Sequence, residues 1–97
     1  MGQDELPDVA IYGHPNDPYV QQLQAHLQQR GMPFSLLDVD RSEDSMEFAA
    51  LRNEGPDLKA VVVIGPEEDK EVVVQPSMDE VDRLLARFGF LQPPPLG

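Results

Sequence analysis

The chain has 97 residues, enough to build one hydrophobic core but not two, so we expect a single domain. Its formal net charge is −11, from 18 acidic and 7 basic residues. Nucleic acids and anionic membranes are held by clustered Lys and Arg, so this charge argues against both as partners. It favours a small soluble domain that stays monomeric, with a basic protein partner as the alternative.

No cysteine occurs in the sequence, which excludes a disulfide framework. Residues 1–7 are polar and acidic and lack the basic start and apolar stretch of a secretory signal. No segment approaches the roughly 18 apolar residues that a membrane span requires. We therefore expect a cytoplasmic protein with a flexible N-terminal segment at residues 1–7.

The first strand is predicted at residues 9–12, a short apolar run. A helix is predicted next, because three apolar residues recur on one stripe, Val20, Leu23 and Leu27. Asp17 is a good N-cap for this helix, and Pro18 suits its first turn. Gly31 can adopt the left-handed conformation that ends a helix. His26 lies across the helix from the apolar stripe and is expected at the surface.

A second strand is predicted at residues 34–39 and a second helix at residues 43–53. This helix is expected to turn five apolar residues inward, namely Met46, Phe48, Ala49, Ala50 and Leu51. The segment Asn53-Glu54-Gly55-Pro56 ends it.

Two more strands, at residues 61–64 and 72–74, are expected to form a hairpin across the turn at residues 65–70. A third helix is predicted at residues 78–88, where Ser77 and Glu80 have the spacing of a capping box. Residues 89–97 contain three consecutive prolines and are read as a proline-rich tail. The order of elements is a βαβ unit, a helix, a hairpin and a last helix.

Seven short segments between residues 8 and 88 share their order and spacing with one family. They are 8–12 for a first strand, 15–20 for P-G-C-P-Y-C, 31–34 for G-I-P-Y, 37–40 for I-D-V-D, 53–55 for N-G-G, 58–60 for T-V-P and 74–77 for V-x-N-P-S. Residues 8–88 thus resemble the glutaredoxin family, particularly the short mycoredoxins and ribonucleotide-reductase-partner redoxins. The resemblance implies an α/β thioredoxin-like fold of the glutaredoxin type, a four-stranded mixed sheet flanked by three helices.

The chain departs from this family at its reactive positions. Asp17 stands where the nucleophilic cysteine is expected, and Val20 replaces the resolving cysteine. Thiol–disulfide exchange needs both sulfurs, so no residue is assigned a catalytic role. A carboxylate at a helix start is stabilised by the helix dipole, so Asp17 is interpreted as an N-cap and Val20 as a packing residue. Ala60 replaces a cis-proline, and because a cis bond before a non-proline residue costs about 2.5–4 kcal/mol, the loop is expected to be trans.

The resemblance places the former active-site loop and a possible ligand site at eight residues, His14, Asp17, Pro18, Tyr19, Val20, Lys59, Ala60 and Ser77. His14 falls where the family often has a cation that contacts glutathione, the alternative being an exposed histidine without a ligand. Tyr19 is expected to be exposed, and its hydroxyl could stabilise a glutathione thiolate, as in transferases on a related fold. Lys59 precedes Ala60, at the position whose backbone pairs with glutathione in the family. Ser77 is explained by helix capping.

We therefore predict a cysteine-less, redox-inactive protein that is a noncatalytic binding or regulatory module. We expect no metal and no cofactor, and a protein as the partner. The alternative is a weak binder of glutathione or another thiol compound, with transferase-like activity that uses His14, Asp17 and Tyr19.

Overall fold

The computed structural model describes residues 9–53, 58–66 and 69–90. Its elements run in the order β1 (Val9–Gly13), α1 (Pro18–Gln29), β2 (Ser35–Asp38), α2 (Glu43–Arg52), β3 (Val61–Ile64), β4 (Glu71–Val74) and α3 (Met78–Arg87). The predicted segment 1–7 and residues 91–97 of the predicted tail lie outside the described residues.

The four strands form one mixed sheet in the order β2-β1-β3-β4. β1 runs parallel to β2 and antiparallel to β3, which pairs antiparallel with β4. The prediction of a four-stranded mixed sheet with three helices is confirmed. The predicted hairpin is the pair β3 and β4, with Val61 opposite Val74 and Val63 opposite Val72.

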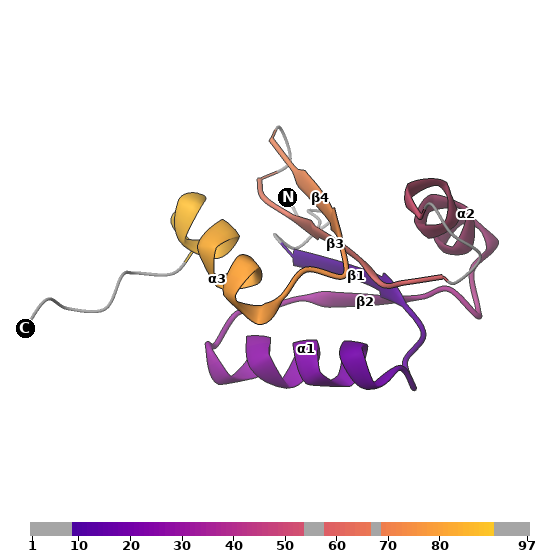
Figure 1. Cartoon of the computed structure of the whole chain (residues 1–97), viewed down its shortest axis with the longest axis horizontal. Coiled ribbons are helices and arrows are strands. Elements are labelled where there is room, and N and C mark those ends of the chain that lie inside the picture. The colour runs from indigo at the N-terminus through magenta and orange to yellow at the C-terminus, as the bar shows by residue number, and fades with distance from the viewer. Residues whose placement is uncertain (1–8, 54–57, 67–68, 91–97) are drawn as a thin grey trace, which may run out of the picture.

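Helices α1 and α3 cover one face of the sheet (Figure 1). The main core lies between them and alternate residues of the two central strands, and comprises chiefly Val9, Ile11, Val20, Leu23, Leu27, Val62, Ile64, Val81, Leu84 and Leu85. All three residues of the predicted α1 stripe are fully buried. Alternation along β1 sends Ala10 and Tyr12 to the opposite face of the sheet.

Helix α2 lies on that opposite face, at one end of the sheet (Figure 1). Its Ala49 packs with Val39 and Val61, and its Phe48 ring stacks on Tyr12 with a centroid distance of 4.3 Å. The prediction that Ala50 and Leu51 also face inward is wrong, since both are exposed, Leu51 by 75%. Only one narrow face of α2, with Ser45 and Ala49, packs against the sheet. Successive residues of a helix are rotated by about 100° around its axis, so Ala50 and Leu51 lie away from that face.

The helix ends follow the capping chemistry of the sequence. The carboxylate of Asp17 accepts a hydrogen bond from the Tyr19 N–H, and Gly31 has the left-handed φ of 67° after α1. The Ser77 hydroxyl accepts from the Glu80 N–H at the start of α3. Beyond α3, the Phe90 N–H donates to the Leu85 carbonyl, and the Phe90 ring packs against the main core. The first two residues of the predicted tail are therefore part of the folded structure.

Candidate functional site

The fold brings three of the candidate segments together at the start of α1. Gly13, at the end of β1, lies beside Val20 of α1 and Ala60, which precedes β3. The Ala60 carbonyl accepts a hydrogen bond from the Gln75 N–H. This bond holds the segment between β4 and α3 beside Ala60. Val20 and Ala60, two of the residues that the resemblance assigns to a ligand site, are thus neighbours in space.

Asp17 is used as a helix cap. Its Oδ1 accepts the Tyr19 N–H at 3.0 Å, and its backbone is extended, as is usual for an N-cap. Pro18 occupies the first helical position, where its missing N–H costs nothing. The N-cap prediction for Asp17 is confirmed, and the carboxylate occupies the helix terminus that would stabilise a thiolate in a redox protein.

Val20 and Ala60 pack against Gly13 near the start of α1. Val20 is fully buried and Ala60 is 1% exposed. A Cβ placed on Gly13 would lie only 2.9 Å from Val20 Cγ2 and 3.3 Å from Ala60 Cβ, so the three residues pack without spare room. No peptide bond in the described parts of the chain is cis, as expected for a loop with Ala60 in place of proline.

Tyr19 is half-buried, so the expectation that it is exposed is wrong. Its hydroxyl donates a hydrogen bond to the Pro76 carbonyl oxygen at 2.5 Å. Burial, followed by the nearby carboxylates of Glu80 and Asp17, raises the pKa of Tyr19 well above its ordinary value of about 10. Pro76 immediately precedes Ser77, the N-cap of α3. The Tyr19 side chain therefore connects the first turn of α1 to the start of α3.

The backbone of Lys59 is also occupied. The Asn53 side chain accepts a hydrogen bond from the Lys59 N–H at 2.9 Å and donates one to the Lys59 carbonyl at 3.1 Å. Both backbone groups that the resemblance offers to a ligand are therefore satisfied within the chain. The sequence places Asn53 at the end of α2 and in the segment that resembles N-G-G, and assigns its side chain no contact. An Asn side chain has both a donor and an acceptor, and this was the available signal for a backbone clamp.

His14 is paired rather than isolated. Its Nδ1 lies 2.9 Å from Asp40 Oδ2, and its side chain is 37% exposed. The loop after β2 brings Asp40 against the loop after β1, a pairing that the sequence did not indicate. Ser77 is exposed, and its Oγ accepts the Glu80 N–H at 3.1 Å. The capping explanation accounts for its side chain.

His26 joins α1 to α3 and is partly buried, whereas the sequence predicts a surface position. Its side chain is 15% exposed, and its Nε2 lies 2.8 Å from Asp82 Oδ1. Asp82 also accepts two hydrogen bonds from the Arg30 guanidinium, at 2.6 and 2.8 Å. The hydrogen bond from Arg30 is the main reason that the pKa of Asp82 lies below its ordinary value, and His26 adds to the effect. The sequence does not indicate Asp82, because contacts with residues 52 and 56 positions away leave no local pattern.

Metal and membrane chemistry receive no support from the described part of the chain. Within residues 9–53, 58–66 and 69–90, no three His, Asp or Glu side chains gather into a possible metal site. No helix in these same ranges is long and apolar enough to cross a membrane.

Comparison with known proteins identifies the architecture. No known family profile matches the sequence, and no curated protein matches it. Among solved structures, the chain is similar to the glutaredoxin from Archaeoglobus fulgidus, with a TM-score of 0.60 over 81% of this chain and 86% of that one. The chain has a glutaredoxin-like fold. The two sequences are 18% identical, a level at which the similarity establishes the fold and leaves the activity to be argued from the residues.

Proposed function

We propose that this glutaredoxin-like chain is redox-inactive and acts in the cytoplasm as a noncatalytic binding or regulatory module. The observation that carries the proposal is the chemistry at the start of α1. A carboxylate that caps the helix stands at position 17 and a buried valine at position 20, and the chain contains no cysteine. Without a thiolate and a resolving sulfur, disulfide exchange has neither its attacking nor its resolving group.

The remaining groups of the glutaredoxin-like site support binding of glutathione poorly. The Tyr19 hydroxyl donates to Pro76, and its raised pKa makes it harder to ionise, so it is poorly suited to activate a thiol. The Lys59 backbone is held by Asn53, and His14 faces Asp40. The transferase-like alternative would require these internal contacts to break before a ligand could use the same atoms.

The charge of the chain gives the expected kind of partner. With a net charge of −11, long-range attraction favours a protein with a basic surface and disfavours anionic macromolecules. We take the chain to be a monomer in the absence of that partner.

The proposal is tested with a mixed-disulfide reductase assay on the purified chain, which should match the blank without enzyme. Ala60→Pro alone should also be inactive, because it restores the loop residue but no sulfur. The triple variant Asp17→Cys, Val20→Cys and Ala60→Pro, which restores both sulfurs and the loop proline, is the positive control and should show measurable turnover. Turnover by the unmodified chain that persists through stringent purification would contradict the proposal.

A further inference from the structure

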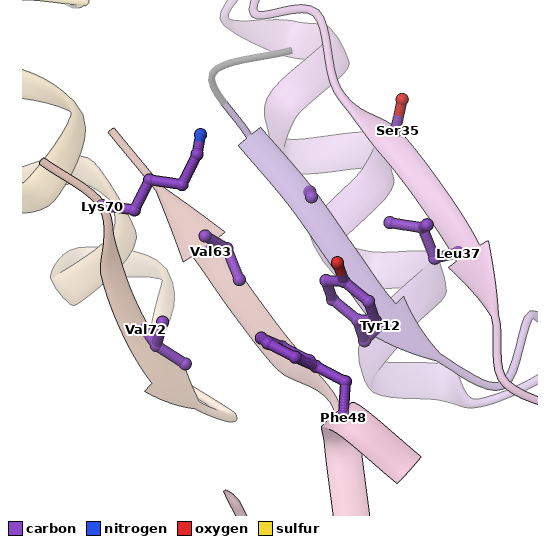
Figure 2. A pocket seen from close by; sticks show the side chains of 8 residues that line it. Tyr12, Ser35, Leu37, Phe48, Val63, Lys70 and Val72 are labelled. Carbon is purple, nitrogen blue, oxygen red and sulfur yellow. The ribbon is translucent and has the colours of Figure 1, made fainter. Parts of the chain in front are cut away.

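One face of the sheet carries an apolar groove that none of the three described helices fills. Its walls are Ala10, Tyr12, Ser35, Leu37, Phe48, Val63, Lys70 and Val72, from all four strands, α2 and the residue before β4 (Figure 2). The groove lies on the α2 face of the sheet, opposite α1. It is therefore separate from the cap of α1 and from the glutaredoxin-like site.

Strand register explains why the groove exists. Ser35, Ala10, Val63 and Val72 lie opposite one another and form one row across the sheet. The next row on the same face begins with Leu37 and Tyr12, and there Phe48 of α2 stacks on the Tyr12 ring. The first row has short side chains, whereas the second contains the larger Leu37 and Tyr12, with Phe48 of α2 above them. The surface is therefore lower beside the Tyr12–Phe48 pair. Figure 2 shows Phe48 and Lys70 at opposite ends of this space.

The volume of the groove limits the size of its ligand. It measures about 240 Å³. An engineered apolar cavity of about 150 Å³ accommodates benzene, so this groove has room for roughly ten non-hydrogen atoms. Drug-sized ligands usually occupy about 300–1,000 Å³, so a nucleotide cofactor is too large.

Lys70 determines the charge that the groove favours. Its ammonium group donates to the Gly65 carbonyl at 3.2 Å. Within the described residues it has no carboxylate at ion-pair distance, whereas Arg30, Arg41 and Arg87 each have one. An ammonium group at the edge of an apolar surface is complementary to an anion attached to an apolar body.

We propose that this groove binds small monocarboxylic acids, with the apolar body on the row from Ala10 to Val72 and the carboxylate paired with Lys70. The inference gives a ligand class to the proposed binding role and rests on that role. No covalent step is involved.

The probe is 3-phenylpropionate, and 3-phenylpropanol serves as its uncharged counterpart. Titration of the isotope-labelled full chain should give saturable amide shifts at Ala10, Val63 and Val72, with a Kd on the order of 0.1–1 mM. The alcohol should bind at least about fivefold more weakly, because it cannot form the charge-assisted contact. Lys70→Met should weaken the acid to the level of the alcohol and leave the alcohol unchanged.

Val72 and Val74 provide a matched pair of variants. Both are 38% exposed on the same side of β4, but only Val72 lines the groove. Val72→Thr places a hydroxyl in the groove and should weaken both probes, whereas Val74→Thr should weaken neither. Thr keeps the β-branched shape that suits a strand, so both variants should fold.

Three results would overturn the inference: no saturable shift in the groove, equal binding of acid and alcohol, or shifts that gather around Asp17 and Tyr19 instead. Occupation of the groove by a segment of the chain itself would give the first of these results. Failure here is distinct from failure of the redox-inactive role, since reductase turnover is measured separately and would leave this titration unchanged.

Discussion

The Tyr19 hydroxyl donates a hydrogen bond to the Pro76 carbonyl oxygen, which joins the first turn of α1 to the residue before the cap of α3. The two residues are 57 positions apart in the sequence. The contact begins two residues after the Asp17 cap, at the start of α1. Tyr19 therefore holds the two helices in position.

Replacing Tyr19 by phenylalanine should lower the stability of the chain. Loss of the hydrogen bond should reduce the free energy of unfolding by about 0.5–1.5 kcal/mol, as measured by chemical denaturation. Tyr12→Phe is the matched control, because no hydrogen bond joins the Tyr12 hydroxyl to any part of the chain that the structure describes. Equal stability of wild type and Tyr19→Phe would show that the hydroxyl does not hold the helices together.

The cap of α1 gives a second prediction. Asp17→Ala should lower the free energy of unfolding by about 0.5–2 kcal/mol, because the Tyr19 N–H loses its acceptor at the helix start. Asp17→Ser should be far milder, since serine also accepts this bond. If the alanine variant is as stable as wild type in urea, the carboxylate is not acting as a cap, and a functional role for it gains support.

The sequence was sufficient to predict the local features of the fold. The apolar stripe of α1, the caps at Asp17 and Ser77, the left-handed Gly31 and the short valine runs are patterns within a few residues, and each predicted element forms. Most of the differences concern contacts between distant segments. His26 meets Asp82, His14 meets Asp40, and nothing local to these residues indicates their partners. The order of the strands came from the resemblance, because periodicity fixes each element but not its neighbours.

The groove also could not be predicted from the sequence. Ala10, Val63 and Val72 belong to separate strands, and their alignment in one row depends on a register that the pattern of each strand alone does not determine. Ala50 and Leu51 show the opposite failure. The apolar run in this helix predicts an inward face that includes both residues, although only Ser45 and Ala49 of α2 are buried.

Acid stability should depend on Asp82. Its pKa is lowered from an ordinary value of 3.8, chiefly by Arg30, so the charged form is favoured in the folded state. A group of this kind stabilises the fold above its unfolded pKa, and that contribution is lost as the pH falls through the lower folded pKa. The free energy of unfolding should therefore drop below about pH 4.

Asp82→Asn should reduce the loss of unfolding free energy at acid pH, because the substituted side chain does not titrate. Denaturation curves collected from neutral pH to pH 2 give the comparison, with Glu47→Gln as a control at an exposed carboxylate of α2. If Asp82→Asn loses as much stability at acid pH as wild type, other carboxylates account for the loss.

The tight packing at Gly13 gives a further prediction. Gly13→Ala should destabilise the chain by about 1–3 kcal/mol, because the added methyl group meets Val20 at 2.9 Å. The same change should cost less in a Val20→Ala background, where the methyl group has room. A double-mutant cycle by chemical denaturation measures this coupling, and strict additivity would rule out the close packing described here.

The central claim is that the groups of the glutaredoxin-like site are engaged in holding the fold and do not form a ligand site. Titration of the labelled chain with glutathione tests it most directly, with amide shifts followed at His14, Tyr19, Ala60 and Ser77. The internal contacts of these groups predict no saturable shifts at low-millimolar glutathione. Saturable binding in the micromolar range at those residues would contradict the account and favour a thiol-ligand protein.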